Sequence, residues 1–271
     1  MSNEKFVHGV PVVHWNPRRP IVKGRIGNRL KKPGRTNNFG DMITPMLVEE
    51  IVGSSRSLRP APPQGRRLVG IGSIMHFARQ GDVVWGTGVN GKTSEAVYTT
   101  TELDVRAVRG PLTREFLQRR GTPAPEIYGD PALLLPEYFP QLKEWAAHRT
   151  HALTIVPNLN DLPGYPKRPE VLNPRRPLMV CLERIARSRF VVGSSLHAII
   201  IAEALGIPAR LVTSPKEHAF KYEDYFFGTG RTATGAASSL DQALREGSAA
   251  DPLNFSTDAL TAAFPRDLWV D

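Results

Sequence analysis

Residues 190–212, FVVGSSLHAIIIAEALGIPARLV, place a strand, a turn, a helix and a second strand in one short stretch. The run FVV favours a strand, and Gly193 permits a tight exit from it. The pattern then predicts a helix over 196–205, ended by a glycine, and a second strand over 209–212. A strand–helix–strand unit of this kind builds a parallel sheet with the helix on its face.

The same alternation recurs along the chain, in one series before about residue 148 and in another after it. RRLVGIGSI and GDVVWGTGVNG each predict a strand that runs into a glycine turn. LDVRAVRGPLTREFLQRRG predicts a strand, a corner and a helix with Pro111 at its first position. The alternation predicts an α/β protein whose parallel sheets carry helices on both faces. We expect domains at 36–148 and 149–234, an irregular segment at 1–35 and a helix-forming tail at 235–271.

The charge of the chain is strongly basic. It carries 35 Lys and Arg against 26 Asp and Glu, a net charge of +9. Such a field attracts polyanions, anionic membrane surfaces or phosphorylated small molecules. The basic residues fall in short clusters without interleaved aromatic residues, so no nucleic-acid partner is expected.

The sequence offers no signal for membrane insertion or secretion. It has no apolar run of the roughly 18 residues that a transmembrane helix requires. Its first residues lack the basic start and apolar core of a secretory signal. Cys181 is the single cysteine, which excludes an internal disulfide and a cysteine-built metal site. We therefore expect a cytoplasmic protein, and docking at the inner face of the membrane is a further hypothesis.

Several catalytic signatures are missing from the sequence. Gly70 and Gly72 lack the third glycine of a dinucleotide-binding fingerprint, because Met75 stands in its place. The sequence contains no phosphate-binding P-loop and no Gly-x-Ser-x-Gly elbow. The histidines do not fall into a metal-ligand spacing. We expect neither a metal nor an organic cofactor.

Polar residues that the apolar pattern does not require gather after the predicted strands. In α/β sheets, ligands bind at the carboxyl ends of the strands. His197 lies in the first turn of the helix predicted over 196–205, where unpaired N–H groups form a ready anion site. The candidate segments are 38–41, 85–88, 106–110, 193–197 and 216–225.

Taken together, these segments resemble the polysaccharide pyruvyltransferase family. Asn38-Phe39-Gly40-Asp41 followed by a helix is similar to the N-terminal glycine–aspartate loop of that family. VWGTGV at 84–89 and VRAVRGPLTREFL with YGDPALLL resemble its strand–glycine segment and its arginine block. SRFVVGSSLHAIIIAEALGIPARLV is similar to its most recognisable segment, in which Ser-x-x-His opens a helix. The motifs match in order and approximate spacing over about residues 36–228.

The resemblance implies two Rossmann-like domains in an arrangement like that of the GT-B glycosyltransferases, with the active site in the cleft between them. It implies transfer of the enolpyruvyl unit of phosphoenolpyruvate onto two hydroxyls of a sugar. The products are a cyclic pyruvate ketal and free phosphate. The acceptor would be a bacterial surface polysaccharide or its lipid-linked precursor, and phosphoenolpyruvate the donor.

That chemistry calls for a proton donor and for cations. We expect His197 to be the proton donor, with a bound phosphate raising its pKa. The alternative is a histidine that only bonds a backbone carbonyl. Arg109 and Arg106 are candidates for holding phosphate or carboxylate, although Arg106 on its strand could instead point to solvent. Lys221 is a further anion-binding candidate. Ser194 and Ser195 are expected to cap the helix and to contribute a hydroxyl or N–H to the phosphate.

Four other side chains are candidates for acceptor binding or structural support. Asn38 and Asp41 lie in a loop expected to face the cleft, but Asp41 could also be no more than a helix cap. Asp224 is expected to orient Lys221 or to accept a hydrogen bond from a sugar hydroxyl; the alternative is that the two form only a solvated surface pair. Trp85 either stacks on a sugar ring or packs in the core.

Two other functions are compatible with the sequence. A GT-B-like glycosyltransferase that uses a nucleotide sugar would bind a diphosphate at the same helix, because fold alone does not set function. A non-enzymatic basic protein that binds glycans or nucleic acid is a more remote alternative. Donor consumption separates the first from a pyruvyltransferase, and steep salt-dependent oligonucleotide binding without turnover would favour the second.

Overall fold

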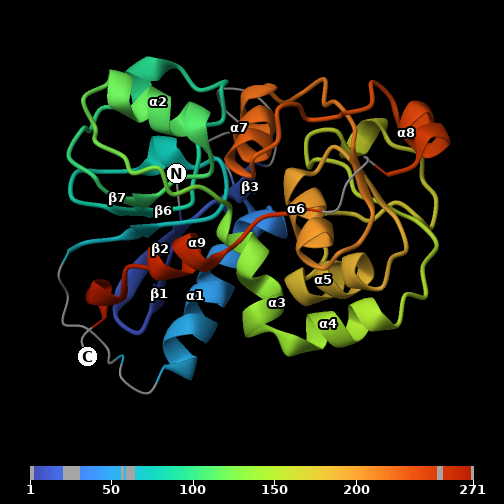
Figure 1. Cartoon of the computed structure of the whole chain (residues 1–271), viewed down its shortest axis with the longest axis horizontal. Helices are drawn as coiled ribbons and strands as arrows, with labels where there is room; N and C mark the ends of the chain where they lie inside the picture. The colour runs from blue at the N-terminus through green and yellow to red at the C-terminus, as the bar shows by residue number, and fades with distance from the viewer. Residues whose placement is uncertain (1–2, 21–30, 56–57, 59–64, 249–252, 270–271) are drawn as a thin grey trace.

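In a computed structural model of the chain, two mainly parallel sheets lie side by side with helices around and between them (Figure 1). The structure describes residues 3–20, 31–55, 58, 65–248 and 253–269. The first sheet has five strands in the order β1-β2-β5-β6-β7. These are β1 (Asn3–Val7), β2 (Val10–His14), β5 (Leu68–Val69), β6 (Val83–Trp85) and β7 (Asp104–Ala107). The last four run parallel, and β1 pairs antiparallel with β2. The predicted α/β class is confirmed.

The N-terminal segment departs from the expectation of an irregular stretch. Residues 3–14 form a hairpin, and β2 lies inside the first sheet beside β5. His8 and Gly9 both have positive φ values, 44° and 88°, which suit the two central residues of a tight hairpin turn. Two short strands follow, β3 (Arg18–Pro20) and β4 (Lys31–Arg35), which pair with each other. The segment 21–30 between them lies outside the described residues.

The second sheet has three parallel strands in the order β10-β9-β8. They are β8 (Thr154–Ile155), β9 (Val191–Gly193) and β10 (Ala209–Leu211), and α6 (Leu196–Ala204) connects the last two. The strand–helix–strand unit predicted over 190–212 is therefore confirmed. Gly193 has a φ of +145°, and a Cβ on it would press against the Val156 carbonyl, with its carbon at 2.7 Å. No other residue type fits this turn without strain.

The remaining helices cover the sheets. They are α1 (Ile43–Ser54), α2 (Pro111–Arg119), α3 (Leu135–Tyr138), α4 (Pro140–Ala147), α5 (Leu178–Ala186), α7 (Phe220–Gly228), α8 (Leu240–Glu246) and α9 (Asp258–Ala262). Pro111 takes the first position of α2, as predicted. Within the described ranges, no helix is long and apolar enough to cross a membrane.

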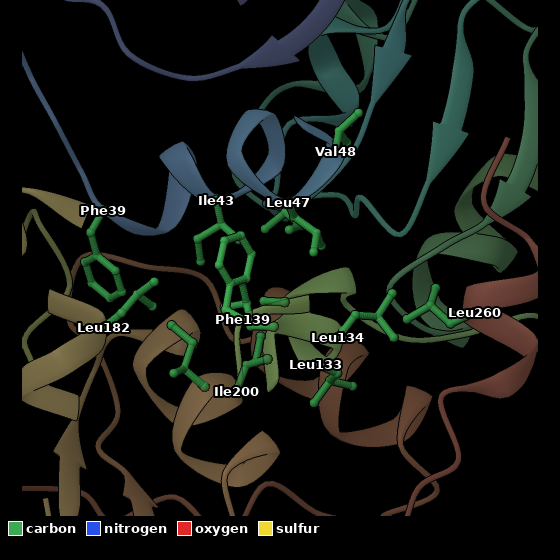
Figure 2. Close-up of a cluster of buried hydrophobic side chains, with 14 of the residues drawn as sticks. Phe39, Ile43, Leu47, Val48, Leu133, Leu134, Phe139, Leu182, Ile200 and Leu260 are labelled. Atoms are coloured by element: carbon green, nitrogen blue, oxygen red, sulfur yellow. The ribbon is translucent and has the colours of Figure 1, made fainter. Parts of the chain in front are cut away.

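One hydrophobic core joins the two sheets. The same cluster of buried side chains includes Leu68 of the first sheet and Val191 of the second. Figure 2 shows its centre, where Ile43 and Leu47 of α1 face Ile200 of α6. Helices from both parts of the chain therefore meet in a shared apolar interior, which holds the two sheets in a defined orientation.

Helix α7 follows the second sheet in sequence but packs on α2 of the first (Figure 1). The contact depends on two glycines. A Cβ on Gly110 would overlap the Asp224 carbonyl group, and one on Gly228 would overlap the Arg109 carbonyl oxygen. The backbones of the two helices thus approach more closely than any side chain would allow.

The C-terminal tail returns to the first sheet. The indole N–H of Trp269 donates to the Val7 carbonyl at 3.1 Å, and that of Trp85 donates to the Leu260 carbonyl at 2.9 Å. The Phe264 ring lies between the two indoles, 5.0 Å from Trp85 and 5.4 Å from Trp269 between ring centroids. Residues near the two ends of the described chain are therefore packed together under the same sheet.

Candidate active site

A cavity of about 320 Å³ lies where loops from both sheets meet. Each loop follows the carboxyl end of a parallel strand, which is where α/β sheets bind ligands. Ser73 follows β5, Lys92 follows β6 and Arg109 follows β7 in the first sheet. From the second sheet come Asn158 after β8, His197 after β9, and Glu217 and Lys221 after β10.

Six of the ten residues singled out in the sequence line this cavity, and four do not. The six are Asn38, Asp41, Arg109, Ser195, His197 and Lys221. The four are Arg106, Ser194, Asp224 and Trp85. The structure therefore gathers the segment 38–41, the arginine block and the start of α6 around one space, although they are far apart in the chain.

His197 lies in the first turn of α6 and rests on Gly40. A Cβ on Gly40 would lie 2.6 Å from His197 Cγ and 2.9 Å from Cε1, and closer still to Nδ1. The ring nitrogen Nε2 is buried and has no hydrogen-bond partner among the described residues. Burial and the charges of Lys221 and Arg109 lower the pKa of His197 to about 3. At neutral pH the imidazole is therefore uncharged when the cavity is empty.

Arg109 is almost completely buried, at 1% exposure, and is held from several sides. Its Nε donates to Asp224 Oδ2 at 3.0 Å, and Nη2 donates to the Val89 carbonyl at 2.7 Å. Its Nη1 donates to the hydroxyl of Ser73 at 2.6 Å, and Ser73 also lines the cavity. The network fixes the guanidinium so that its Nη1 edge lies toward the cavity.

Asp224 does not orient Lys221, contrary to expectation. Its carboxylate accepts hydrogen bonds from Arg109 and from both the backbone N–H and the hydroxyl of Thr113, at 2.8 and 2.7 Å. It is fully buried beneath α2, so it does not reach the cavity or a sugar hydroxyl. Asp224 instead positions Arg109.

Lys221 of α7 pairs at 3.0 Å with Glu217, which lies in the loop before that helix. The Glu217 carboxylate also accepts hydrogen bonds from Lys92 and from the side-chain amide of Asn160, both at 2.8 Å. Burial opposes ionisation of Glu217, but Lys221, Lys92 and Asn160 lower its pKa overall. Burial lowers the pKa of Lys221, an effect that Glu217 opposes. Two ammonium groups, one from the loop after β6 and one from α7, are thus held on one carboxylate.

Asp41 does not cap α1. A short 3₁₀ turn, Gly40–Met42, precedes the helix, which begins at Ile43. The side-chain amide of Asn38 instead donates to Asp41 Oδ2 at 2.6 Å. Burial raises the pKa of the Asp41 carboxyl to about 7, although the Asn38 hydrogen bond and Lys221 act in the opposite direction.

Neither serine caps α6 with its side chain, contrary to expectation. The Ser194 hydroxyl donates to Asp161 Oδ2 at 2.6 Å and accepts from the Asn158 N–H at 2.9 Å. It is fully buried and braces the loop after β8. Ser195 is the N-cap residue and lines the cavity. The first turn of α6 therefore has no side-chain cap at the cavity.

Arg106 and Trp85 lie outside the site. Arg106 pairs with Asp104 at 2.5 Å and with Asp267 at 2.9 Å on the outer edge of the first sheet, so it does not hold a ligand in the cavity. Trp85 is fully buried and packs against the C-terminal tail, so it is a core residue and does not stack on a sugar.

A sequence model of the family described as "Polysaccharide pyruvyl transferase" matches residues 51–215. The match covers more than half of the chain. The chain belongs to the polysaccharide pyruvyl transferase family.

One curated relative is the succinoglycan biosynthesis protein ExoV of Rhizobium meliloti (strain 1021). The two sequences are 29% identical over 202 residues, which cover 69% of this chain and 60% of ExoV. The chain thus spans less than two thirds of the length of this relative. Within the family match lie Arg109, Ser195 and His197, whereas Asp41 and Lys221 lie outside it.

Sequence reasoning missed several residues that line the cavity of this family member. They are Trp15, Ser73, His76, Asn90, Lys92, Asp130, Asn158, Asn160 and Glu217. The polar residues after β6 follow a predicted strand, so the rule that ligands bind at carboxyl ends could have marked them. Asp130 stands in the segment YGDPALLL, in which no local pattern distinguishes a ligand-binding carboxylate from a structural one. Burial raises the pKa of Asp130 to about 6, and one of its oxygens accepts from the Ala132 N–H at 3.0 Å.

Proposed function

We propose that the protein transfers the enolpyruvyl group of phosphoenolpyruvate onto two hydroxyls of a sugar. The acceptor is a bacterial surface polysaccharide or its lipid-linked precursor, and the products are a pyruvate ketal and phosphate. Family membership supports pyruvyl transfer to a polysaccharide. The succinoglycan role in the printed name of ExoV supports an exopolysaccharide acceptor.

The observation that carries the proposal is the convergence of three anion-binding features on one cavity. The first turn of α6 opens onto it without a side-chain cap, and such a turn presents N–H donors and partial positive charge. The Nη1 edge of Arg109 and the ammonium of Lys221 line the same space. Phosphoenolpyruvate carries roughly three negative charges near neutral pH, on a phosphate and a carboxylate, so it needs such a set.

The roles divide by chemistry. Arg109 is suited to binding a carboxylate or two oxygens of a phosphate, because its guanidinium N–H donors lie in one plane at fixed spacing. Lys221 carries a compact charge. When an anion binds to it, the ion pair between Lys221 and Glu217 is weakened. His197 is the catalytic residue of this proposal, since it lines the same cavity and its buried Nε2 has no partner among the described residues.

The two sheets suggest a larger arrangement. We propose that the halves around them correspond to the two domains of a GT-B-like enzyme, with boundaries near 36–148 and 149–234 and the cavity at their junction. We further propose that the enzyme acts in the cytoplasm, and that its net charge of +9 lets it dock at the anionic inner face of the membrane. Lipid-linked acceptors are assembled at such a surface.

The direct test supplies phosphoenolpyruvate with a panel of lipid-linked and synthetic glycosides. Phosphate release together with the mass gain of a ketal supports the proposal. The control supplies nucleotide sugars with the same acceptors. Nucleotide release, without consumption of phosphoenolpyruvate, contradicts it in favour of a glycosyltransferase.

A further inference from the structure

Asp41 and His197 enter the cavity from two elements that touch each other. The His197 ring rests on the backbone of Gly40, the residue before Asp41. Both side chains line the cavity together with Lys221 and Arg109. A ligand held by the two cations therefore lies within reach of a carboxyl group and an imidazole at the same time.

The surroundings of Asp41 favour its protonated form. Among the described residues, Asn38 provides the one hydrogen bond recorded to this carboxyl. A buried carboxylate needs two or three donors to stay ionised at low pH. The charged groups that face it are Lys221, which favours ionisation, and Glu217, which opposes it. Burial is the strongest influence and raises the pKa to about 7, so a large fraction of the carboxyl is an acid at neutral pH.

The surroundings of His197 favour its neutral form. Lys221 and Arg109 face it, and burial adds to their effect. Its Nε2 is buried without a partner among the described residues, and the residue lines the cavity. Two titratable groups in one site whose pKa values are pushed apart are typical of an acid and a base. A bound anion raises both pKa values.

We propose that Asp41 protonates the methylene carbon of phosphoenolpyruvate and that neutral His197 accepts the proton of the attacking sugar hydroxyl. The assignment rests on the proposed function, and it reverses the expectation that His197 is the proton donor. Asn38 is a positioning residue that acts through Asp41.

The steps balance without an outside reagent. The C2–C3 π electrons of phosphoenolpyruvate take the Asp41 proton, a C3–H bond forms, and C2 becomes an oxocarbenium centre. The first sugar hydroxyl forms an O–C2 bond and gives its proton to His197. The C2–O bond to phosphate then breaks, phosphate leaves with the electron pair, and His197 returns its proton to the phosphate. The second hydroxyl closes the ketal on C2 and gives its proton to the Asp41 carboxylate, so both residues end as they began.

The experiment compares pH profiles of ketal formation for the wild-type protein, Asp41→Asn and His197→Gln. Wild-type kcat/KM is expected to fall as pH rises through about 7, because Asp41 loses its proton. Each substitution is expected to lower kcat by about 10²- to 10⁴-fold, the usual contribution of an acid or base. The residual rate of Asp41→Asn no longer falls above about pH 7, whereas that of His197→Gln keeps the fall. The proposal is overturned if Asp41→Asn keeps the fall in rate above about pH 7 and His197→Gln loses it. It is also overturned if Asp130→Asn loses this fall and Asp41→Asn does not.

Two further measurements keep the test independent of fold and of the proposed function. Asn38→Ala removes a hydrogen bond that favours the ionised carboxylate, so it must move the fall in rate to higher pH; an unmoved or lowered fall contradicts the assignment. Carbon-13 NMR of Asp41 in the free protein titrates the carboxyl directly. A pKa below about 5 overturns the inference even if ketal forms, whereas absence of any phosphoenolpyruvate consumption by the wild type rejects the proposed function alone.

Discussion

Replacing Gly40 by alanine tests whether catalysis depends on the placement of His197. The added Cβ would lie 2.6 Å from Cγ and 2.9 Å from Cε1 of the imidazole. Ordinary contacts between carbon atoms are about 3.5–4.0 Å, so the ring has to withdraw by about 1 Å. A misplacement of that size costs roughly 100-fold in rate when the group acts on the reacting atoms. We therefore expect Gly40→Ala to lower kcat for ketal formation about 100-fold.

The same helical region supplies a matched control. A Cβ on Gly53, near the end of α1, meets nothing within 4 Å, so Gly53→Ala should stabilise the fold by about 0.5–1 kcal/mol and leave turnover unchanged. Turnover is measured as phosphate release, and folding by thermal unfolding of each variant. If Gly40→Ala stays folded and turns over within about threefold of the wild type, the role of His197 in the reaction is refuted.

Three other substitutions, the first with a control, probe separate parts of the structure. Arg109→Lys removes the planar guanidinium, which donates both to Asp224 and toward the cavity, so kcat/KM for phosphoenolpyruvate should fall by about 100-fold or more. Arg106→Lys, on the outer edge of the sheet, is the control and should keep kcat/KM within about threefold of the wild type. Gly193→Ala places a side chain at a φ of +145° and against the Val156 carbonyl, so urea unfolding should show a loss of at least about 3 kcal/mol. Asp41→Asn should raise the melting temperature at about pH 8 and raise it less at about pH 5. A pKa raised by folding to about 7 means that stability falls as pH rises from about 4 to about 7, and asparagine removes that loss. An equal effect at both pH values would contradict the raised pKa.

The parts of the fold that could be predicted are those set by local periodicity. The unit of β9, α6 and β10 follows from two apolar runs around a glycine turn, and each signal lies within a few residues of the element that it defines. The hairpin at 3–14 was missed because Pro11 and the polar neighbours hid a short alternating pattern. Its place in the sheet depends on a partner, β5, more than 50 residues away.

The sequence predicted which segments surround the candidate site, but it did not predict which charged side chains pair with each other there. Lys221 has acidic residues both three and four positions away, and the helix repeat brings either within reach. Only the packing of α7 on α2 decides that Asp224 is taken by Arg109 and that Glu217 is left for Lys221. The raised pKa of Asp41 is likewise a product of its surroundings, which no local pattern reports.

The close backbone contact between α2 and α7 makes α7 a tie between the two halves of the chain. Gly110 and Gly228 let α7 pack against α2 of the first half. On its other side, the hydroxyl of Tyr222 donates to the Ser194 carbonyl at 2.8 Å and that of Tyr225 donates to Glu203 of α6 at 2.6 Å. Lys221 is therefore anchored to both walls of the cavity, and the packing of this one helix fixes its position relative to Arg109 and His197.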